Sequence, residues 1–216
     1  MVYGALQITF GVIVGFSAFL VLDKYTTAQN TVTSEAADVV EIHRFAEQLP
    51  ETDRDYVQEL AKSYTRVVVQ EEWPMMGSGQ SNSHADELVN ELGRGIEDFE
   101  PGTDAERAVY AQGLERMQTL TEDRELRLLN VREGLPPILW IILIVLATTI
   151  VVFTYFLGMG RARIHWWAVG TLTSGLTFVI LTIVVLDHPF GGEFRVGPDA
   201  FKRAQNIMEA TGGQGT

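Results

Sequence analysis

The sequence predicts an all-α integral membrane protein with three transmembrane helices and a helical soluble domain inserted between the first and the second. Two apolar runs near the C-terminus, Leu135–Leu157 and Trp166–Leu186, contain no charged residue. Each exceeds the ~20 residues that a helix needs to cross a bilayer. A third uncharged run covers Tyr3–Leu22. A backbone in lipid must satisfy its own hydrogen bonds, so these runs are predicted to be helices rather than strands.

The two C-terminal runs are separated by only eight residues, 158–165. So short a connection requires the two helices to run antiparallel, as a transmembrane hairpin. Trp140 lies near the start of the first helix, and Trp166 and Trp167 open the second. Indole rings favour the membrane–water interface, which agrees with these positions.

The N-terminal run is either a signal peptide or a first transmembrane helix. It has no basic n-region and no A-x-A cleavage pattern, which favours the transmembrane helix. Gly4, Gly11 and Gly15 share one face, and this glycine stripe is predicted to be a helix-packing seam. The bulky side chains of Phe10, Phe16 and Phe19 are then expected to contact lipid or a neighbouring subunit.

Charge divides the chain between two solvents. The net charge is −12, and residues 23–133 contain 24 acidic and 11 basic residues. A nucleic-acid partner is excluded because phosphate binding needs a basic face. We therefore divide the chain into a first transmembrane helix (1–24), an acidic helical soluble domain (25–134), a transmembrane hairpin (135–187) and an interfacial turn with a C-terminal tail (188–216).

Helical periodicity runs through the acidic domain. One helix is expected over Ser34–Leu49, and the next is expected to reach Trp73, where Pro74 stops it. Ser83 is expected to cap a further helix. Thr103 and Glu106 match a capping box that opens a long helix to Glu133. After the hairpin, a short amphipathic helix is expected over Asp199–Ala210.

Four stretches, in this order, resemble one family. They are Glu72-Trp73-Pro74-Met75, Arg124-Glu125-Leu126-Arg127-Leu128, Leu135-Pro136-Pro137-Ile138-Leu139-Trp140 and Leu186-Asp187-His188-Pro189-Phe190-Gly191-Gly192. Together they are similar to the prokaryotic bestrophin-like membrane proteins, a family long catalogued as a domain of unknown function. The resemblance covers nearly the whole chain. It implies kinship with bestrophins, which are pentameric anion channels with cytosolic helical regions. Three predicted spans rather than four depart from the bestrophin plan, so no pore or calcium residue is carried over.

Three arginines precede the hairpin: Arg124, Arg127 and Arg132. Charged rings often stand at the mouths of ion pores, so these arginines are candidates for an anion vestibule. The commoner role of such residues is to anchor lipid headgroups or to pair with nearby acids. The acids nearest in sequence are Glu122, Asp123, Glu125 and Glu133.

Asp187 directly follows an uncharged helix. Either it is a cation or proton site, shared with Asp23 and Glu193, or it accepts backbone N–H groups in the turn before Pro189. The turn is the commoner use of aspartate. The acidic residues of calcium sites usually lie closer together in the sequence than these three, so the sequence does not identify a metal.

Catalysis has little support in the sequence. His43, His84, His165 and His188 are too dispersed for a recognisable metal motif, and no nucleotide-binding or nucleophile-elbow motif is present. We expect no enzyme activity and no cofactor. The expected partners are the lipid membrane, inorganic ions and further copies of the chain, five by the resemblance.

The resemblance favours a passive ion channel, with anions preferred, in the cell membrane and with its soluble domain in the cytoplasm. The alternative is a non-conducting scaffold or sensor whose acidic domain recruits a partner.

Overall fold

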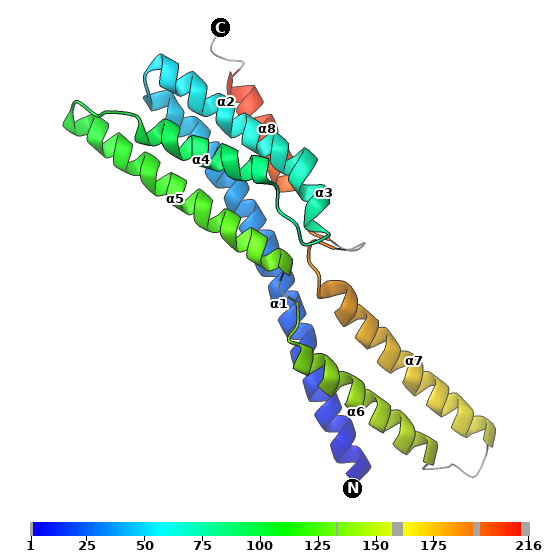
Figure 1. The fold of residues 1–216 in the computed structure, drawn as a ribbon. Helices are drawn as coiled ribbons and strands as arrows, with labels where there is room; N and C mark the ends of the chain where they lie inside the picture. Colours follow the sequence, from blue (N-terminus) through cyan, green and yellow to red (C-terminus); the bar gives the residue numbers. More distant parts are fainter. Residues whose placement is uncertain (1, 133, 157–161, 192–194, 213–216) are drawn as a thin grey trace. The chain divides into compact units, whose positions relative to one another are not determined.

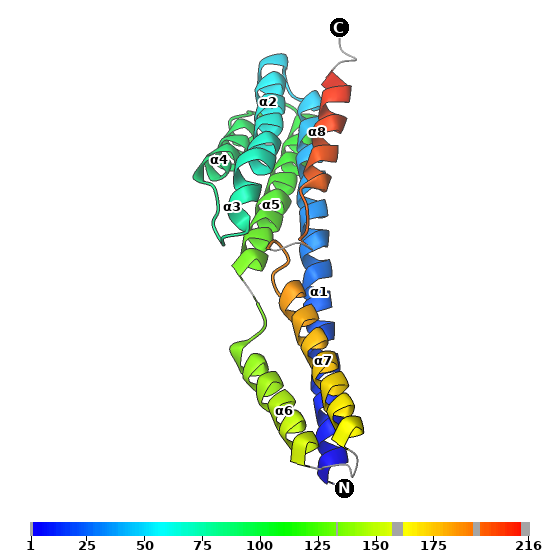
Figure 2. The same cartoon turned by 90° about the vertical axis from the view of Figure 1, so that its right-hand side faces the viewer.

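The computed structural model describes residues 2–132, 134–156, 162–191 and 195–212. The described residues form helices without strands, which confirms the all-α prediction. Three described helices are long and apolar enough to cross a membrane. The chain divides into two compact units, one of residues 1–26 and 133–194 and one of residues 27–132 and 195–216. Figures 1 and 2 show the helices of both units along the chain.

Helix α1 (Val2–Phe45) belongs to both units. No glycine or proline occurs between Gly15 and Pro50, so nothing in the sequence interrupts the helix where the apolar run ends. At about 1.5 Å per residue its 44 residues extend roughly 66 Å, about twice the ~30 Å hydrocarbon core. The first expected soluble helix, Ser34–Leu49, is therefore the continuation of the first predicted span. A 3₁₀ turn at Ala46–Gln48 follows it.

The first unit consists of the start of α1, helix α6 (Pro137–Phe156) and helix α7 (Ala162–Leu186). Its buried residues come from all three helices: Phe10 and Val21 on α1, Leu143, Ala147 and Ile150 on α6, and Ile183 on α7, together with Leu135 before α6. The packed face of α1 thus contains Phe10, which we had expected to contact lipid or a neighbouring subunit. Phe16 and Phe19 are exposed, as expected.

The glycine stripe does not pack within this unit. A Cβ atom added at Gly4, Gly11 or Gly15 would meet no described atom within 4 Å. At about 100° per residue, Gly11 lies about a quarter turn around the helix from the face that carries Phe10 and Val21. In the first unit, α1 therefore packs through the face that carries Phe10 and Val21 and leaves the glycine stripe open.

The second unit combines the end of α1 with helices α2 (Glu51–Val67), α3 (Trp73–Met76), α4 (Ser83–Glu97), α5 (Asp104–Arg132) and α8 (Asp199–Gly212). Helix α2 packs against both α4 and α8, and α4 packs against α5. Figure 2 shows α8 beside α1 in this unit. The C-terminal helix forms as expected, and its Phe201 is fully buried, so the tail contributes to the core of this unit.

Helix α2 continues into α3 through a π-helical turn at Val68–Glu72. The expectation that Pro74 stops this helix at Trp73 was wrong, because the chain remains helical to Met76. The π-turn places Pro74 in the first turn of α3, where the missing N–H of proline costs no hydrogen bond. This turn also directs Glu72 and Trp73 into the interior of the unit, where both are buried.

Two caps fix the starts of α4 and α5. The Asn82 side chain, rather than Ser83, caps α4 by accepting the N–H of His84 at 2.8 Å. The capping box of α5 is confirmed: Thr103 accepts the N–H of Glu106 at 3.2 Å, and Glu106 accepts the N–H of Thr103 at 2.9 Å. Accepting backbone N–H groups from Gly102 and Thr103 lowers the pKa of Glu106.

Candidate functional site

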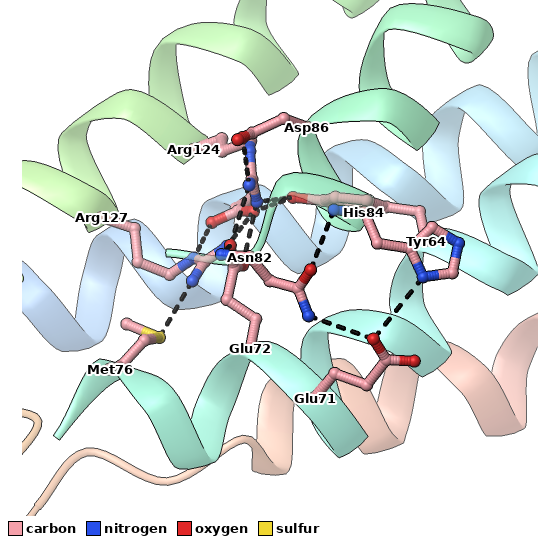
Figure 3. A network of polar contacts seen from close by, with 10 residues as sticks. Tyr64, Glu71, Glu72, Met76, Asn82, His84, Asp86, Arg124 and Arg127 are labelled. Atoms are coloured by element: carbon pink, nitrogen blue, oxygen red, sulfur yellow. Dashed lines mark hydrogen bonds and ion pairs between the residues drawn. The ribbon is translucent and has the colours of Figure 1, made fainter. Parts of the chain in front are cut away.

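The most distinctive site in the second unit is a buried network of alternating acids and arginines. Helix α1 supplies Glu35, the π-turn supplies Glu72, and α5 supplies Arg124 and Arg127. The two arginines are three residues apart and so lie on one face of α5. Figure 3 shows their guanidinium groups converging on Glu72. Glu35, Glu72 and Arg127 are fully buried and Arg124 is 5% exposed.

Arg127 joins two carboxylates on different helices. Its Nη2 atom donates to Glu72 Oε2 at 2.7 Å and to Glu35 Oε1 at 3.0 Å, and its Nε atom donates to the other oxygen of Glu35. The remaining Nη1 atom donates to Met76 Sδ at 3.0 Å. The ring centroids of Trp73 and Phe201 each lie 5.7 Å from the guanidinium carbon. Arg127 therefore holds α1, the π-turn and α8 around one charged group.

Arg124 makes a two-pronged contact with the same Glu72. Its Nη1 and Nη2 atoms lie 2.9 and 2.8 Å from Glu72 Oε2 and Oε1. The Nη2 atom also donates to Asp86 Oδ1 at 2.6 Å, and Asp86 is half-exposed at the edge of the unit. The Tyr64 hydroxyl accepts from Arg124 Nη1 at 3.2 Å and donates to Glu35. Bidentate contacts of this kind are the strong form of an arginine–carboxylate pair.

The contacts within the network favour the charged forms of Glu72 and of both arginines. Burial alone would raise the pKa of Glu72, but Arg127 and Arg124 outweigh it and hold that pKa below its ordinary value. Burial would lower the pKa of Arg127, yet Glu35, Tyr64 and Glu72 raise it well above the ordinary arginine value. The buried Tyr64 hydroxyl has a raised pKa, first through burial and then through the charge of Glu35. Two carboxylates thus balance two guanidinium groups inside the unit.

Further hydrogen bonds around the network join the start of α4 to the π-turn. The backbone N–H of Asn82 donates to Glu72 Oε1 at 3.2 Å, and its side-chain Nδ2 donates to Glu71 Oε2 at 3.1 Å. His84 Nδ1 lies 3.5 Å from the same Glu71 oxygen. The two contacts of Glu71 are at the surface, where such pairs contribute little stability. The backbone N–H of Asn82 gives the buried carboxylate of Glu72 a further donor.

Chemically, this network is suited to holding helices together rather than to reacting. Both oxygens of Glu35 and Glu72 accept hydrogen bonds from arginine, so they present no open position to a ligand. In the ranges that the structure describes, no group of three or more His, Asp or Glu side chains is arranged to hold a metal ion.

The candidate vestibule arginines are the members of this network that the sequence predicted. Arg124 and Arg127 lie in the interior and pair with acids, but not with the acids nearest to them in the sequence. Their partners are 38 to 92 residues away. The side chain of Arg132 lies outside the described residues. Glu35 and Glu72 were missed as site residues, although a charged residue on the apolar face of a helix is a signal for a buried ion pair.

Asp187 is buried at the start of the loop that follows α7. Its Oδ1 atom accepts the backbone N–H of Leu135, just before α6. Nearby, Lys24 Nζ donates to the carbonyl oxygen of Gly134 at 2.7 Å. A Cβ atom at Gly134 would lie 3.0 Å from Asp187 Oδ2, so the glycine permits this close approach. Asp187 thus accepts a backbone N–H group from Leu135 across the unit, and not from the turn before Pro189, where the turn interpretation expected its donors.

The predicted cation site of Asp23, Asp187 and Glu193 stays a prediction. Glu193 lies outside the described residues. Asp23 is exposed and makes no hydrogen bond or ion pair within the described part of the chain.

Fold and sites together define an all-helical membrane protein whose helical unit is held by a buried ion-pair network. The profile of the bestrophin-like domain matches residues 1–201. The chain therefore belongs to the bestrophin-like family, as its four sequence stretches indicate.

Solved structures agree with this assignment at the level of the fold. A bacterial bestrophin homologue from Klebsiella pneumoniae carrying a single substitution superposes with a TM-score of 0.77 at 10% identity, covering 98% of this chain and 87% of the other. A second variant of the Klebsiella pneumoniae homologue gives 0.73 at 14% identity with the same coverage. A structure described only as a membrane protein gives 0.77 at 11% identity. No curated protein matches the chain by sequence.

Proposed function

We propose that the chain is one subunit of an oligomeric, passive ion channel in the cell membrane, with anions as the preferred ions. The observation that carries this proposal is the bestrophin-like match over residues 1–201, in a chain with three candidate spans. In the proposed topology the helical unit is inserted between the first and second spans and lies, with the C-terminus, in the cytoplasm. We further propose that the protein conducts ions without catalysing a reaction.

The apolar surface of the first unit supports assembly into a homo-oligomer. Ile8, Phe16 and Phe19 on α1 are more than half exposed, and the glycine stripe beside them is open. Helix α7 adds an apolar groove of about 720 Å³ that begins at Trp167 and ends at Val179. Small residues at membrane-helix surfaces let a second backbone approach closely. Five subunits is the number that the bestrophins suggest. A single-chain mass, both in gentle detergent and after cross-linking in native membranes, would contradict assembly.

The ion path would be uncharged along the spans. The hydroxyls of Thr149, Thr154, Thr171 and Thr182 donate to the carbonyl four residues earlier in their own helices. They therefore do not need a partner in a pore, and an apolar constriction that gates by losing water fits these helices better. Because Arg124 and Arg127 are paired with acids, anion preference is supported by the bestrophin resemblance alone.

Purified protein in planar bilayers tests conduction and selectivity together. Under asymmetric chloride with an impermeant cation, we expect single-channel currents that reverse near the chloride equilibrium potential. A reversal potential near that of the cation, measured in asymmetric sodium chloride, would keep the channel and refute anion preference. Bilayers that remain silent across voltage, pH and calcium concentration would refute conduction.

Silent bilayers would favour the scaffold or sensor, and one feature of the helical unit supports that alternative. An open groove of about 530 Å³ lies between α4 and α5, with an apolar floor at Val89 and Met117. Its lining also contains three acids, Glu97, Glu122 and Glu125, and one base, Arg94, so it is acidic on balance. A groove of this kind suits a basic amphipathic segment of a partner.

The proposed orientation is tested with a single cysteine, since the natural chain has none. In a Ser81→Cys variant, we expect no labelling by a membrane-impermeant thiol reagent in intact cells and full labelling after lysis. Ser81 precedes the cap of α4 and is partly exposed. Labelling in intact cells would place the helical unit outside the cell.

A further inference from the structure

A pair of carboxyl groups lies one helical turn from the arginine network and makes no ion pair with any arginine whose side chain the structure describes. Asp38 on α1 and Asp123 on α5 occupy matching positions on two antiparallel helices, between the contacts Arg127–Glu35 and Gly113–Phe45. Asp38 is 7% exposed. One buried oxygen of each carboxyl group, Oδ2 in both cases, has no hydrogen-bond partner among the described residues. Unpaired buried carboxylate oxygens are rare in folded proteins because each costs the free energy of its lost hydration.

The packing of α1 against α5 prevents this pair from separating freely. The two helices run antiparallel, with Arg127 bound to Glu35 on one side of the pair. On the other side, Gly113 is so close to Phe45 that an added Cβ atom would lie 2.5 Å from its ring. Asp38 and Asp123 are therefore held face to face between two fixed contacts. Asp38 is also 15 residues beyond Asp23, about 22 Å further along α1 than the end of the uncharged run.

We propose that Asp38 and Asp123 form a proton-binding site that holds one proton between α1 and α5 and releases it as the pH rises towards neutrality. The shared proton turns one carboxyl group into a donor and the other into its acceptor. Loss of the proton leaves two negative charges facing each other across the helix contact. This inference concerns the helical unit and does not depend on whether the protein conducts ions.

The groups around the pair favour retention of the proton, because most of them raise the pKa of Asp38. Burial is the main cause that raises the pKa of Asp38 to about 6, and the charge and hydrogen bond of Asp123 add to it. Glu35, one turn away on α1, acts in the same direction, whereas Arg116 on α5 opposes it. A second carboxyl group close to a buried aspartate raises its pKa in this way.

The sign of the pH dependence follows from the raised pKa. The unfolded aspartate has an ordinary pKa near 3.9, so the folded state binds more protons between about pH 4 and pH 6. The stability contributed by the pair is therefore complete below the unfolded value and is lost as the pH rises through about 6. We expect the unfolding temperature of the full chain in detergent to fall by about 5 °C or more over this range because of the pair.

Infrared difference spectroscopy on the full chain in detergent tests the proton directly. We expect the carbonyl band of a protonated carboxylic acid at acidic pH, disappearing as the pH passes about 6. Asp38→Asn should remove this band and flatten the pH dependence of unfolding, since an amide can donate to Asp123 at any pH. Glu115→Gln, which changes an exposed acid on α5, should keep both signals.

If Asp38→Asn fails to fold, Asp123→Asn gives the same test at the partly exposed member of the pair. The proposal is overturned if no carboxylic-acid band titrates in this range, or if the band survives in the variant that folds. It is also overturned if added sodium or calcium displaces the proton and shifts the midpoint in proportion to its concentration, because the pair would then be a cation site.

Discussion

Replacement of Arg127 by methionine should destabilise the helical unit more than the loss of any surface ion pair would. Methionine keeps much of the apolar volume between Trp73 and Phe201 but removes the positive charge. Glu35 then retains the Tyr64 hydroxyl, and Glu72 retains Arg124. One negative charge of the balanced set is left buried without compensation. Breaking a buried pair in this way costs about 3–5 kcal/mol, which corresponds to a fall in unfolding temperature on the order of 10 °C.

The matched control is Arg107→Met, on the same helix. Arg107 pairs with Asp104 at 2.8 Å, but the two side chains are 64% and 96% exposed. Exposed pairs contribute about 1 kcal/mol or less. Both variants are compared with the natural protein by denaturant unfolding in detergent, followed through tryptophan fluorescence, because Trp73 lies against Arg127. Equal losses in the two variants would refute the assignment of a buried, balanced network.

The pH dependence of this comparison provides a second readout. In the natural protein the lowered pKa of Glu72 means that its stabilisation is present above the unfolded value near 4.3 and is lost as the pH falls through the lower folded value. In Arg127→Met one carboxyl group of the network has lost its compensating positive charge, so it binds a proton more readily than in the natural protein. The stability difference between the two proteins should therefore narrow as the pH falls below about 5. A constant difference would mean that the cost comes from packing rather than from charge.

Three further substitutions test other parts of the structure. Asp187→Ala leaves a buried backbone N–H without its acceptor and should cost about 1–3 kcal/mol in thermal unfolding, whereas His188→Ala, at an exposed neighbour, should cost nothing measurable. Gly113→Ala places a Cβ atom 2.5 Å from an aromatic ring and should destabilise the protein by about 1–3 kcal/mol. Gly93→Ala, whose new Cβ atom would have its nearest neighbour at 3.9 Å, should be neutral or slightly stabilising. The reverse order of stabilities would refute the α1–α5 packing. A Cβ atom at Gly11 would meet no described atom within 4 Å, so we expect Gly11→Leu to change the unfolding of a single chain little but to lower the oligomer mass measured in native detergent complexes. An unchanged mass would exclude the stripe as a seam.

Much of the fold could be predicted because its signals are local. An uncharged run of about 20 residues, a capping box or an amphipathic repeat depends only on neighbours in the sequence. The prediction that Pro74 ends a helix used the same kind of reasoning and was wrong. A π-turn changed the position of Pro74 within the helix, and nothing in the sequence around it specifies a π-turn.

The candidate site was only half predictable, for a related reason. The sequence drew attention to Arg124 and Arg127 but assigned them neighbours in the chain as partners. Glu35 is 92 residues from Arg127, and Glu72 is 52 residues from Arg124. Which acid meets which arginine is decided by how the helices pack, so a single sequence cannot supply the pairing. It does supply a weaker signal, namely charged residues of both signs on the apolar faces of α1 and α5.

The network is better explained by the alignment of helices than by stability. Moving two carboxylates and two guanidinium groups out of water is expensive, and well-packed apolar side chains often match or exceed the net gain of a buried pair. Hydrogen-bond geometry, by contrast, is demanding. A shift of α5 by one turn, about 5.4 Å, would separate Arg127 from Glu35 and leave charges of both signs buried and unpaired. An apolar seam would tolerate the same shift at small cost. Since α1 continues from the candidate span into the helical unit without interruption, the network gives this helix one defined register against α5 and the π-turn.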